Sequence, residues 1–280
     1  MQVKNAIYQG FRATRISWIT ETIYLLLFGL VVGVILLPFS FLVAIASVDL
    51  PAEVTDPLEL GWFFWGSVAL LVFVADLFTL MIIGMVQKIG VDKNNGISHS
   101  FESLVQYPFR NGRFTSFLLL SLITSVIGGV LGIIVYLLDN WLNIYSNNIL
   151  YDDWILGIAE VIVLLILTPP ILIATYSIIR DDSRLNAFVA GWKNYLNKFS
   201  DFSVMHLLAL IPMAVIIALI TFTGIAISWF GDGEQTMELF YILTLSFVII
   251  VISLLLVFIG LPFYLLTVAN GYEENNKTIA

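Results

Sequence analysis

The most regular pattern of apolar and polar positions lies between Ser183 and Ile220. In its first half, apolar side chains recur at three- and four-residue steps, which places them on one face of a helix. The residues of this face are Leu185, Phe188, Val189, Trp192, Tyr195, Leu196 and Phe199. Asparagines and lysines take the opposite face, and from Phe202 onward the polar face disappears. The pattern predicts an amphipathic helix in a membrane interface that leads into a membrane-spanning helix.

Apolar runs long enough to cross a bilayer occur six times, since about 20 apolar residues span the hydrocarbon core. We expect the spans at about 22–47, 62–87, 114–138, 154–179, 202–229 and 239–269. The composition agrees, because 60% of the residues are hydrophobic and 11% are charged, far from the soluble range. No stretch between the runs is long enough for a soluble domain. Residues 1–280 are therefore expected to form a single polytopic membrane domain.

The pairing of an interfacial helix with a span recurs along the chain. The sequence NAIYQGFRATRISW, which begins at Asn5, matches NAFVAGWKNYLNKF, which begins at Asn186, and aligns Gly10 with Gly191. A weaker match relates RFTSFLLLSLI, which begins at Arg113, to KFSDFSVMHLL, which begins at Lys198. The first interfacial helix is expected at 4–19, and the second is a short apolar stripe of Ile97, Phe101, Leu104 and Pro108.

The even-numbered spans also correspond, because Pro170 and Pro262 each precede a threonine by five residues, near the same end of the span. Together these matches predict three tandem units, at about 1–90, 91–182 and 183–280. Each unit contributes an interfacial helix and two spans, so the units share one orientation. The predicted fold is an all-α, six-span integral membrane bundle with pseudo-threefold symmetry about the membrane normal.

The basic residues are confined to one side of the predicted membrane topology. All 12 Lys and Arg residues fall at the two termini or in the connections between spans two and three and between spans four and five. The other side carries about ten carboxylates and no Lys or Arg. Because basic residues in short loops mark the cytoplasmic side, we expect both termini in the cytoplasm.

An Ala-, Gly- and aromatic-rich interfacial helix such as AFVAGWKNYLNKF, with two spans per unit and six in total, resembles a group of poorly characterised prokaryotic membrane families. The chain is similar to YciC-type proteins and to the membrane domain attached to some glycerophosphoryl diester phosphodiesterases. The resemblance covers nearly the whole chain and implies a fold and a location in the prokaryotic plasma membrane. The phosphodiesterase barrel of those fusions has no counterpart here, so the resemblance implies no catalytic residue.

Two carboxylates are candidates for an intramembrane polar site. Asp76 is the only acidic residue near the predicted mid-bilayer, where an ionised side chain costs about 2.5–3.5 kcal/mol on insertion scales. It either serves a polar path or is neutral and hydrogen-bonded between helices. Glu160 lies about six residues from the outer edge of its span, either in that path or as a hydrated boundary residue.

Motifs for chemistry are scarce. The chain has no cysteine and only two histidines, His99 and His206, which are far apart in the sequence, and no metal-binding motif is present. We therefore expect no metal, no cofactor, no catalytic residue and no nucleic-acid partner.

The interfacial helices are the stronger functional lead. Their cations would meet anionic headgroups, at about 1 kcal/mol per Lys or Arg. The candidate lipid-contact residues are Arg12, Arg15, Trp18, Arg110, Arg113, Arg184, Trp192, Lys193 and Lys198. The leading hypothesis is a non-enzymatic multi-pass protein that organises or associates with membrane lipid or a membrane protein partner. The alternatives are that the helices only brace the bundle, that the chain is a small transporter or channel using Asp76 and Glu160, or, least favoured, that it is a lipid-modifying enzyme.

Overall fold

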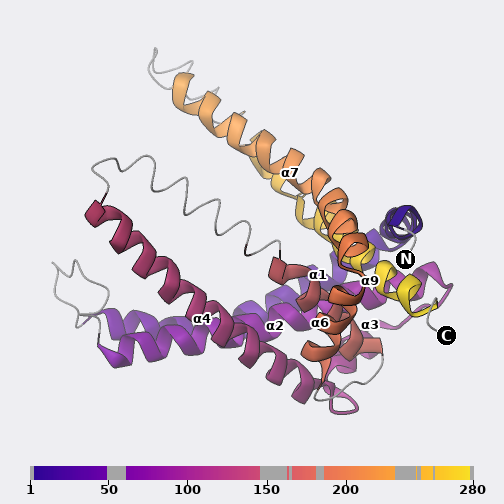
Figure 1. The fold of residues 1–280 in the computed structure, drawn as a ribbon, viewed down its shortest axis with the longest axis horizontal. Coiled ribbons are helices and arrows are strands. Elements are labelled where there is room, and N and C mark those ends of the chain that lie inside the picture. Colours follow the sequence, from indigo (N-terminus) through magenta and orange to yellow (C-terminus); the bar gives the residue numbers. More distant parts are fainter. Residues whose placement is uncertain are drawn as a thin grey trace. The chain divides into compact units, whose positions relative to one another are not determined.

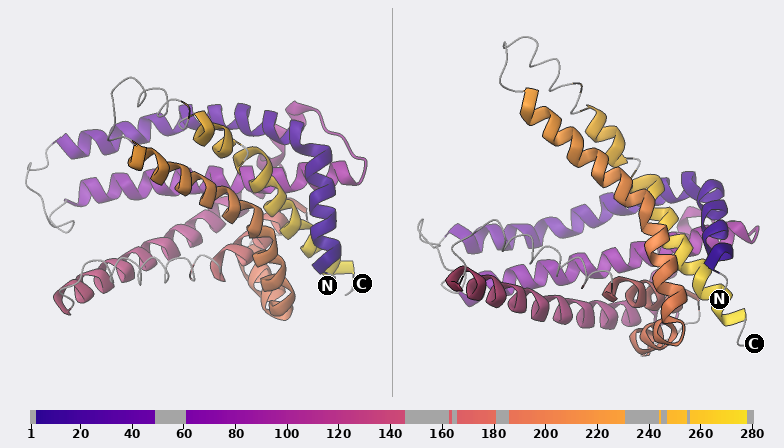
Figure 2. Two further views of the ribbon diagram at one scale, coloured as in Figure 1. Left: turned by 90° about the horizontal axis from the view of Figure 1, so that it is seen from above. Right: turned by 45° about the horizontal axis from the view of Figure 1, so that its top comes forward.

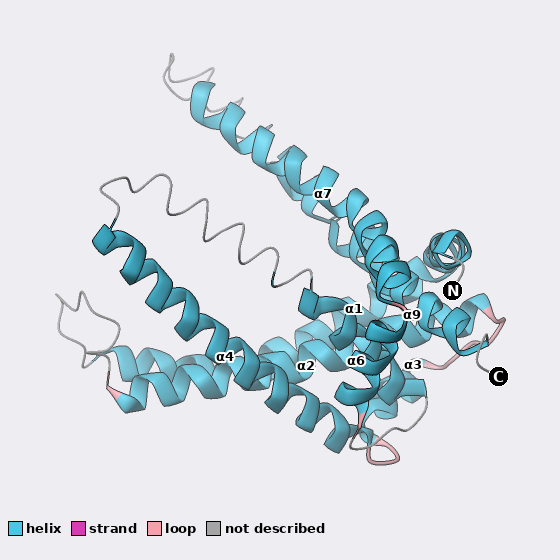
Figure 3. Cartoon of the chain, viewed as in Figure 1, coloured by secondary structure: helices cyan, strands magenta, loops and turns pink. Residues whose placement is uncertain are grey.

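The computed structural model describes residues 3–48, 61–145, 163, 166–180, 186–230, 244, 247–254 and 256–277. These residues are helical apart from short turns, and no strand occurs among them (Figure 3). The elements are α1 (Val3–Val48), α2 (Trp62–Asn94), α3 (Phe101–Gln106), the 3₁₀-helix η2 (Tyr107–Phe109), α4 (Arg113–Tyr145), α6 (Ala187–Asn197), α7 (Phe199–Phe230), the π-helix η3 (Leu256–Gly260) and α9 (Leu261–Lys277) (Figure 1). Residues 166–180 and 247–254 are also helical.

Four helices of the described chain are long and apolar enough to cross a membrane. They are Val3–Ser47, Trp62–Asn94, Arg113–Leu138 and Phe247–Asn275. Two shorter apolar helices, Ile166–Arg180 and Phe199–Pro212, lie where the fourth and fifth spans are expected. The all-helical, membrane-type architecture is thus confirmed, whereas the count of six spans and the threefold symmetry stay predictions.

The first interfacial helix and the first span form one continuous helix, α1, instead of two separate elements. No glycine or proline interrupts residues 11–28, where the two were expected to meet. The Thr14 hydroxyl donates to the Gly10 carbonyl at 2.9 Å, and the Ser17 hydroxyl donates to the Ala13 carbonyl at 2.6 Å. These bonds satisfy both hydroxyls within the helix, and α1 continues through the change from amphipathic to apolar sequence.

The predicted third repeat differs: the helix expected to be interfacial, α6, ends at Asn197, and α7 begins at Phe199. Lys198 forms the turn between them: its amide donates to the Tyr195 carbonyl, and its carbonyl accepts from the Phe202 amide. The sequence pattern suggested that the amphipathic stretch runs straight into the apolar helix. The turn at Lys198 separates the two helices instead.

The end of α2 is closed by a glycine motif. Gly96 has a φ of +78°, a conformation that suits glycine at a helix C-terminus. The Gly96 amide donates to the Lys93 carbonyl, and the Ile97 amide donates to the Asp92 carbonyl. This pair of bonds is the Schellman pattern, which satisfies two of the last carbonyls of α2. Downstream, Ser100 caps α3 through its side chain.

The chain divides into two compact units. The first consists of Met1–Ile23, Val86–His99 and Asn194–Ala280, and the second of Tyr24–Met85 and Ser100–Lys193. Neither follows the boundaries of the expected repeat units.

In the first unit, α7 and α9 lie side by side (Figure 2). Phe202, Met205 and Ala209 of α7 are fully buried, as are Leu266 and Ala269 of α9. Two glycines bring other helices close to α9. A Cβ on Gly10 would lie 2.9 Å from the Thr267 Cα, and a Cβ on Gly90 would collide with the Leu266 side chain. Segment 3–23 is therefore held against α9 at backbone distance at Gly10, whereas Gly90 makes room for the side chain of Leu266.

In the second compact unit, glycines likewise allow close contacts between helices. A Cβ on Gly84 of α2 would lie 2.9 Å from Ile179 and 3.1 Å from Phe117. A Cβ on Gly191 of α6 would meet the Pro170 carbonyl and lie 2.9 Å from the Ala174 Cβ. Gly10 and Gly191, which the sequence match aligns, thus each allow a close contact between a segment predicted to be interfacial and an apolar helix.

We predict that Gly10→Ala destabilises the protein. The added methyl group would collide with the Thr267 backbone, and overpacking costs about 1–3 kcal/mol, which exceeds the gain of up to about 1 kcal/mol in helix propensity. In detergent, the melting temperature should fall by several degrees. Gly33→Ala, on the same helix but with open space around it, is the matched control and should melt at or above the wild-type temperature. Equal melting of the two variants would contradict the close contact.

Candidate functional site

The segment 3–23 of α1 runs across α9 instead of along it. Gly10 contacts Thr267, whereas the side chains of Glu21 and Leu266 both lie against Gly90. Thr267 and Leu266 are consecutive on α9, whereas Gly10 and Glu21 are separated by eleven residues on α1, roughly 16 Å of helix. A helix that crosses the end of an apolar helix in this way has the arrangement expected of an interfacial segment.

An apolar groove of about 520 Å³ lies beside this crossing, entirely within the first compact unit. Phe11, Thr14, Arg15 and Trp18 of α1 line one wall. The other wall comes from α7, η3 and α9, through Pro212, Ile259, Gly260 and Phe263. Arg15 is the only ionisable side chain among these eight residues, so the groove combines an apolar lining with a single positive charge.

A cluster of buried polar side chains lies among α1, α2 and α9. Ser17, Glu21 and Gln87 are fully buried. The Ser17 hydroxyl donates to Glu21 Oε1 at 2.5 Å, and the Gln87 amide donates to the Leu265 carbonyl at 3.4 Å. Lys93 donates to the Thr20 hydroxyl and acts electrostatically on Glu21. The cluster therefore joins α1, α2 and α9 through polar contacts.

Glu21 is the residue of this cluster that sequence reasoning missed. Its second oxygen, Oε2, is buried and has no hydrogen-bond partner in the described part of the chain. A glutamate at the edge of an apolar run is ordinarily solvated, and its burial depends on Gly90, which is distant in the sequence. The available signal was the four-residue spacing of Ser17 and Glu21, which places both on one helix face.

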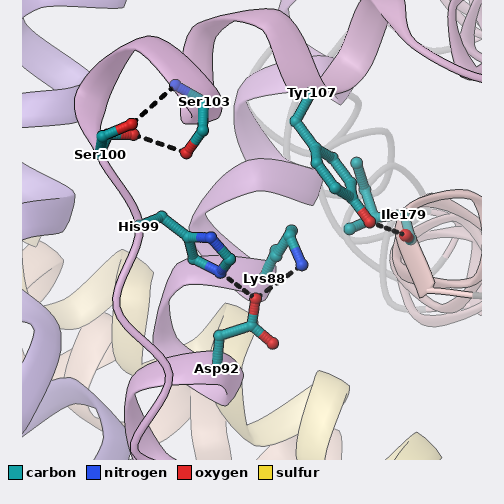
Figure 4. Close-up of polar contacts among 7 residues, drawn as sticks. All are labelled: Lys88, Asp92, His99, Ser100, Ser103, Tyr107 and Ile179. Atoms are coloured by element: carbon teal, nitrogen blue, oxygen red, sulfur yellow. Dashed lines mark hydrogen bonds and ion pairs between the residues drawn. The ribbon is translucent and has the colours of Figure 1, made fainter.

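A second polar group closes the connection after α2 (Figure 4). Asp92 Oδ2 accepts from Lys88 Nζ and lies against His99 Nε2, both at 2.6 Å. The carboxylate thus holds the segment after α2 to its last turns, which is a structural role. In the second compact unit, the Tyr107 hydroxyl donates to the Ile179 carbonyl at 3.1 Å (Figure 4).

The other histidine, His206 of α7, pairs with Tyr264 of α9. The Tyr264 hydroxyl and His206 Nδ1 are 2.6 Å apart, and both side chains are buried. The two histidines thus serve separate contacts. Within the residues that the structure describes, no group of three or more His, Cys, Asp or Glu side chains is placed to hold a metal ion.

Asp76 lies in α2 with its carboxylate capped by the neighbouring helix α4. The Thr124 hydroxyl donates to Asp76 Oδ2 at 2.5 Å. One turn away, the Ser121 hydroxyl donates to the Phe73 carbonyl at 3.1 Å. Asp76 is thus part of a polar contact between two packed helices. Glu160, its proposed companion, lies outside the described residues.

The proposed lipid-contact residues differ in their exposure. Arg12, Arg15, Trp18, Arg110, Lys193 and Lys198 are exposed, and Trp192 is half-buried. Arg113 is buried, with its guanidinium 4.0 Å from the centre of the Tyr107 ring, so it braces the start of α4 and is not part of the exposed surface. Arg184 lies outside the described residues.

Comparison of the chain with protein-family models, curated proteins and solved structures returned no match. The resemblance to the YciC-type and phosphodiesterase-associated membrane families therefore stays a prediction.

We predict that Glu21→Ala lowers stability, whereas Glu21→Gln largely preserves it. Alanine removes the acceptor of the buried Ser17 hydroxyl and leaves a cavity, which together cost about 2–4 kcal/mol. Glutamine keeps the volume and an acceptor oxygen, and brings a donor to the position of the unsatisfied Oε2. The measurement is the melting temperature of the full chain in detergent.

Glu102→Ala is the matched control, because Glu102 is exposed on α3 and its loss should change stability by less than about 0.5 kcal/mol. If Glu21→Gln were as damaging as Glu21→Ala, the charge interaction with Lys93, and not shape and hydrogen bonding, would govern the cluster.

Proposed function

We propose that this chain is a non-enzymatic, six-span membrane protein that associates with the lipid of the cytoplasmic leaflet through its interfacial helices. Its three tandem units place these helices on one face of the bundle, and both termini lie on that side. A membrane protein partner on the same face is compatible with this role. The proposal includes the prokaryotic plasma membrane as its location.

The observation that carries the proposal is the crossing of α1 over α9. It leaves Phe11 and Trp18 exposed by 63% and 46%, beside the exposed cations Arg12 and Arg15. The exposure of aromatic rings to water is unfavourable. In the headgroup region of a membrane, the same rings would enter the acyl boundary and the neighbouring cations would meet phosphates. A segment that only braced the bundle would have no need of these outward-facing side chains.

A second observation favours association over transport. Asp76, the residue on which a polar path would depend, is engaged by the Thr124 hydroxyl of the next helix. A carboxyl group satisfied between two packed helices contributes to helix association, and requires no water-filled path to remain in the membrane. This supports the reading of Asp76 as a structural residue.

We predict that the reconstituted protein enriches anionic lipid around itself. Phosphatidylglycerol with brominated acyl chains should quench tryptophan fluorescence more than brominated phosphatidylcholine at the same mole fraction. The preference should fall in the triple variant Arg12→Gln, Arg110→Gln, Lys198→Gln, because each removed cation is worth about 1 kcal/mol near the surface.

The matched control is the charge-conserving triple variant Arg12→Lys, Arg110→Lys, Lys198→Arg, which should keep the preference. Added salt should weaken it in both the wild type and this control, because exposed charges are screened. Equal quenching by the two lipids in the wild-type protein would refute the proposed function.

The alternative, a small transporter or channel using Asp76 and Glu160, makes a different prediction. It requires ion or solute flux above background in liposomes, and loss of that flux in Asp76→Asn. We expect background flux in both proteins, because Asp76 is engaged between helices. Flux in the wild type that the substitution abolishes would establish the transport reading instead.

A further inference from the structure

The groove between α1 and the helices α7, η3 and α9 has the features of a binding site for one lipid molecule. Its volume of about 520 Å³ lies within the range of about 300–1,000 Å³ that is usual for small-molecule sites. Seven of the eight lining residues carry no ionisable group, and the eighth is Arg15. A ligand that fits this lining is a long apolar chain with an anionic group at one end.

We propose that the groove binds one anionic phospholipid of the cytoplasmic leaflet, with an acyl chain along Pro212 and Ile259 and the phosphate on Arg15. This inference rests on the proposed function, since it assumes that residues 3–23 lie in the membrane interface. It goes further by assigning a single site, a ligand class and the residue that selects it.

The depth of the groove agrees with the reach of one acyl chain. Pro212 lies ten residues beyond Phe202, the expected start of the fifth span, and Ile259 lies ten residues before Ala269, the expected end of the sixth. Each distance corresponds to roughly 15 Å of helix, which is half of a hydrocarbon core of about 30 Å. The two helices therefore line the groove to the depth of one leaflet.

The charge of the groove selects the occupant. Arg15 is exposed and lies on the face of α1 that lines the groove, together with Phe11 and Trp18. A guanidinium binds phosphate through two parallel hydrogen bonds, and no carboxylate is among the lining residues that the structure describes. Arg12, one turn earlier, is equally cationic but does not line the groove.

A second groove provides an internal comparison. It lies within the second compact unit, holds about 350 Å³, and is lined by residues of α1, α2, α3 and η2, among them Val31, Phe78 and Phe101. Val31 follows Trp18 by 13 residues, and Pro212 follows Phe199, the residue aligned with Trp18, by the same number. A groove thus recurs at one register of the proposed repeat. The second groove has no charged lining residue, so the headgroup selection is specific to the first.

The test is a lipid titration of the full-length protein in detergent, followed by native mass spectrometry. Phosphatidylglycerol and phosphatidylcholine with the same acyl chains are the probes. In the wild type, the first phosphatidylglycerol should bind about fivefold more tightly than phosphatidylcholine, the factor that corresponds to about 1 kcal/mol for one cation. Arg15→Gln should remove this difference, whereas Arg12→Gln should keep it.

Occupation of the groove is tested separately. Ile259→Trp places a larger side chain at the groove wall and should remove tight binding of the first phosphatidylglycerol. Ile250→Trp, at an exposed position of the same apolar run that does not line the groove, is the matched control and should bind as the wild type does. Melting temperatures of all variants establish that each is folded.

Four outcomes would overturn the inference. These are equal binding of the two lipids by the wild type, equal losses in Arg15→Gln and Arg12→Gln, displacement of the lipid by excess inorganic phosphate, and a second copy of the chain in place of lipid. If the bilayer still enriches anionic lipid while Arg15→Gln has no effect here, the groove proposal fails and the proposed function stands. If that enrichment is absent, the proposed function itself fails.

Discussion

The structure of the first compact unit depends on the close approach of α1 and α2 to α9. Gly10 and Gly90 favour this approach, because a Cβ at Gly10 would collide with the Thr267 backbone, and a Cβ at Gly90 would collide with the end of the Leu266 side chain. In a membrane, apolar surfaces gain little from leaving lipid, so helix association relies on close packing and on polar contacts between helices. Small residues at the contact therefore determine where α1 crosses α9. The polar cluster around Glu21 and the groove beside Arg15 are consequences of that crossing.

Burial of Glu21 follows from the same geometry. A carboxyl group removed from water is tolerated only with hydrogen bonds or compensating charge, and Ser17 and Lys93 provide these from the same helix and from α2. The side chain occupies space against Gly90 that a larger residue would fill. The close helix contact thus buries the acid, which keeps the hydrogen bond that Ser17 donates from the same helix.

Much of the fold could be predicted because each property depends on local sequence. Backbone groups in lipid must be satisfied within a segment, so apolar runs of sufficient length become helices, and four of the expected spans appear as such helices. The continuity of α1 and the break at Lys198 could not be read from hydropathy, since both depend on individual backbone and hydroxyl hydrogen bonds. Arg113 was expected at the surface because a cation at the edge of a span ordinarily faces headgroups, yet the ring of Tyr107 covers it. Glu21 was missed because its partners come from distant parts of the chain.

The difference between properties of local sequence and contacts with distant residues also explains why a site can arise where the sequence suggests only a surface. Residues 4–19 have the composition of an interfacial helix, and such a helix alone would interact with headgroups diffusely, through whichever cations faced them. When it is fixed across α9, its apolar face no longer rests on lipid alone. Part of that face becomes one wall of a groove, and Arg15 acquires a fixed position relative to Pro212 and Ile259. A cation that lines an apolar groove can discriminate between ligands in a way that a mobile surface cation cannot, because both ends of the ligand must fit at once. The lipid specificity that we propose would depend on where two helices cross more than on how many cations the chain carries.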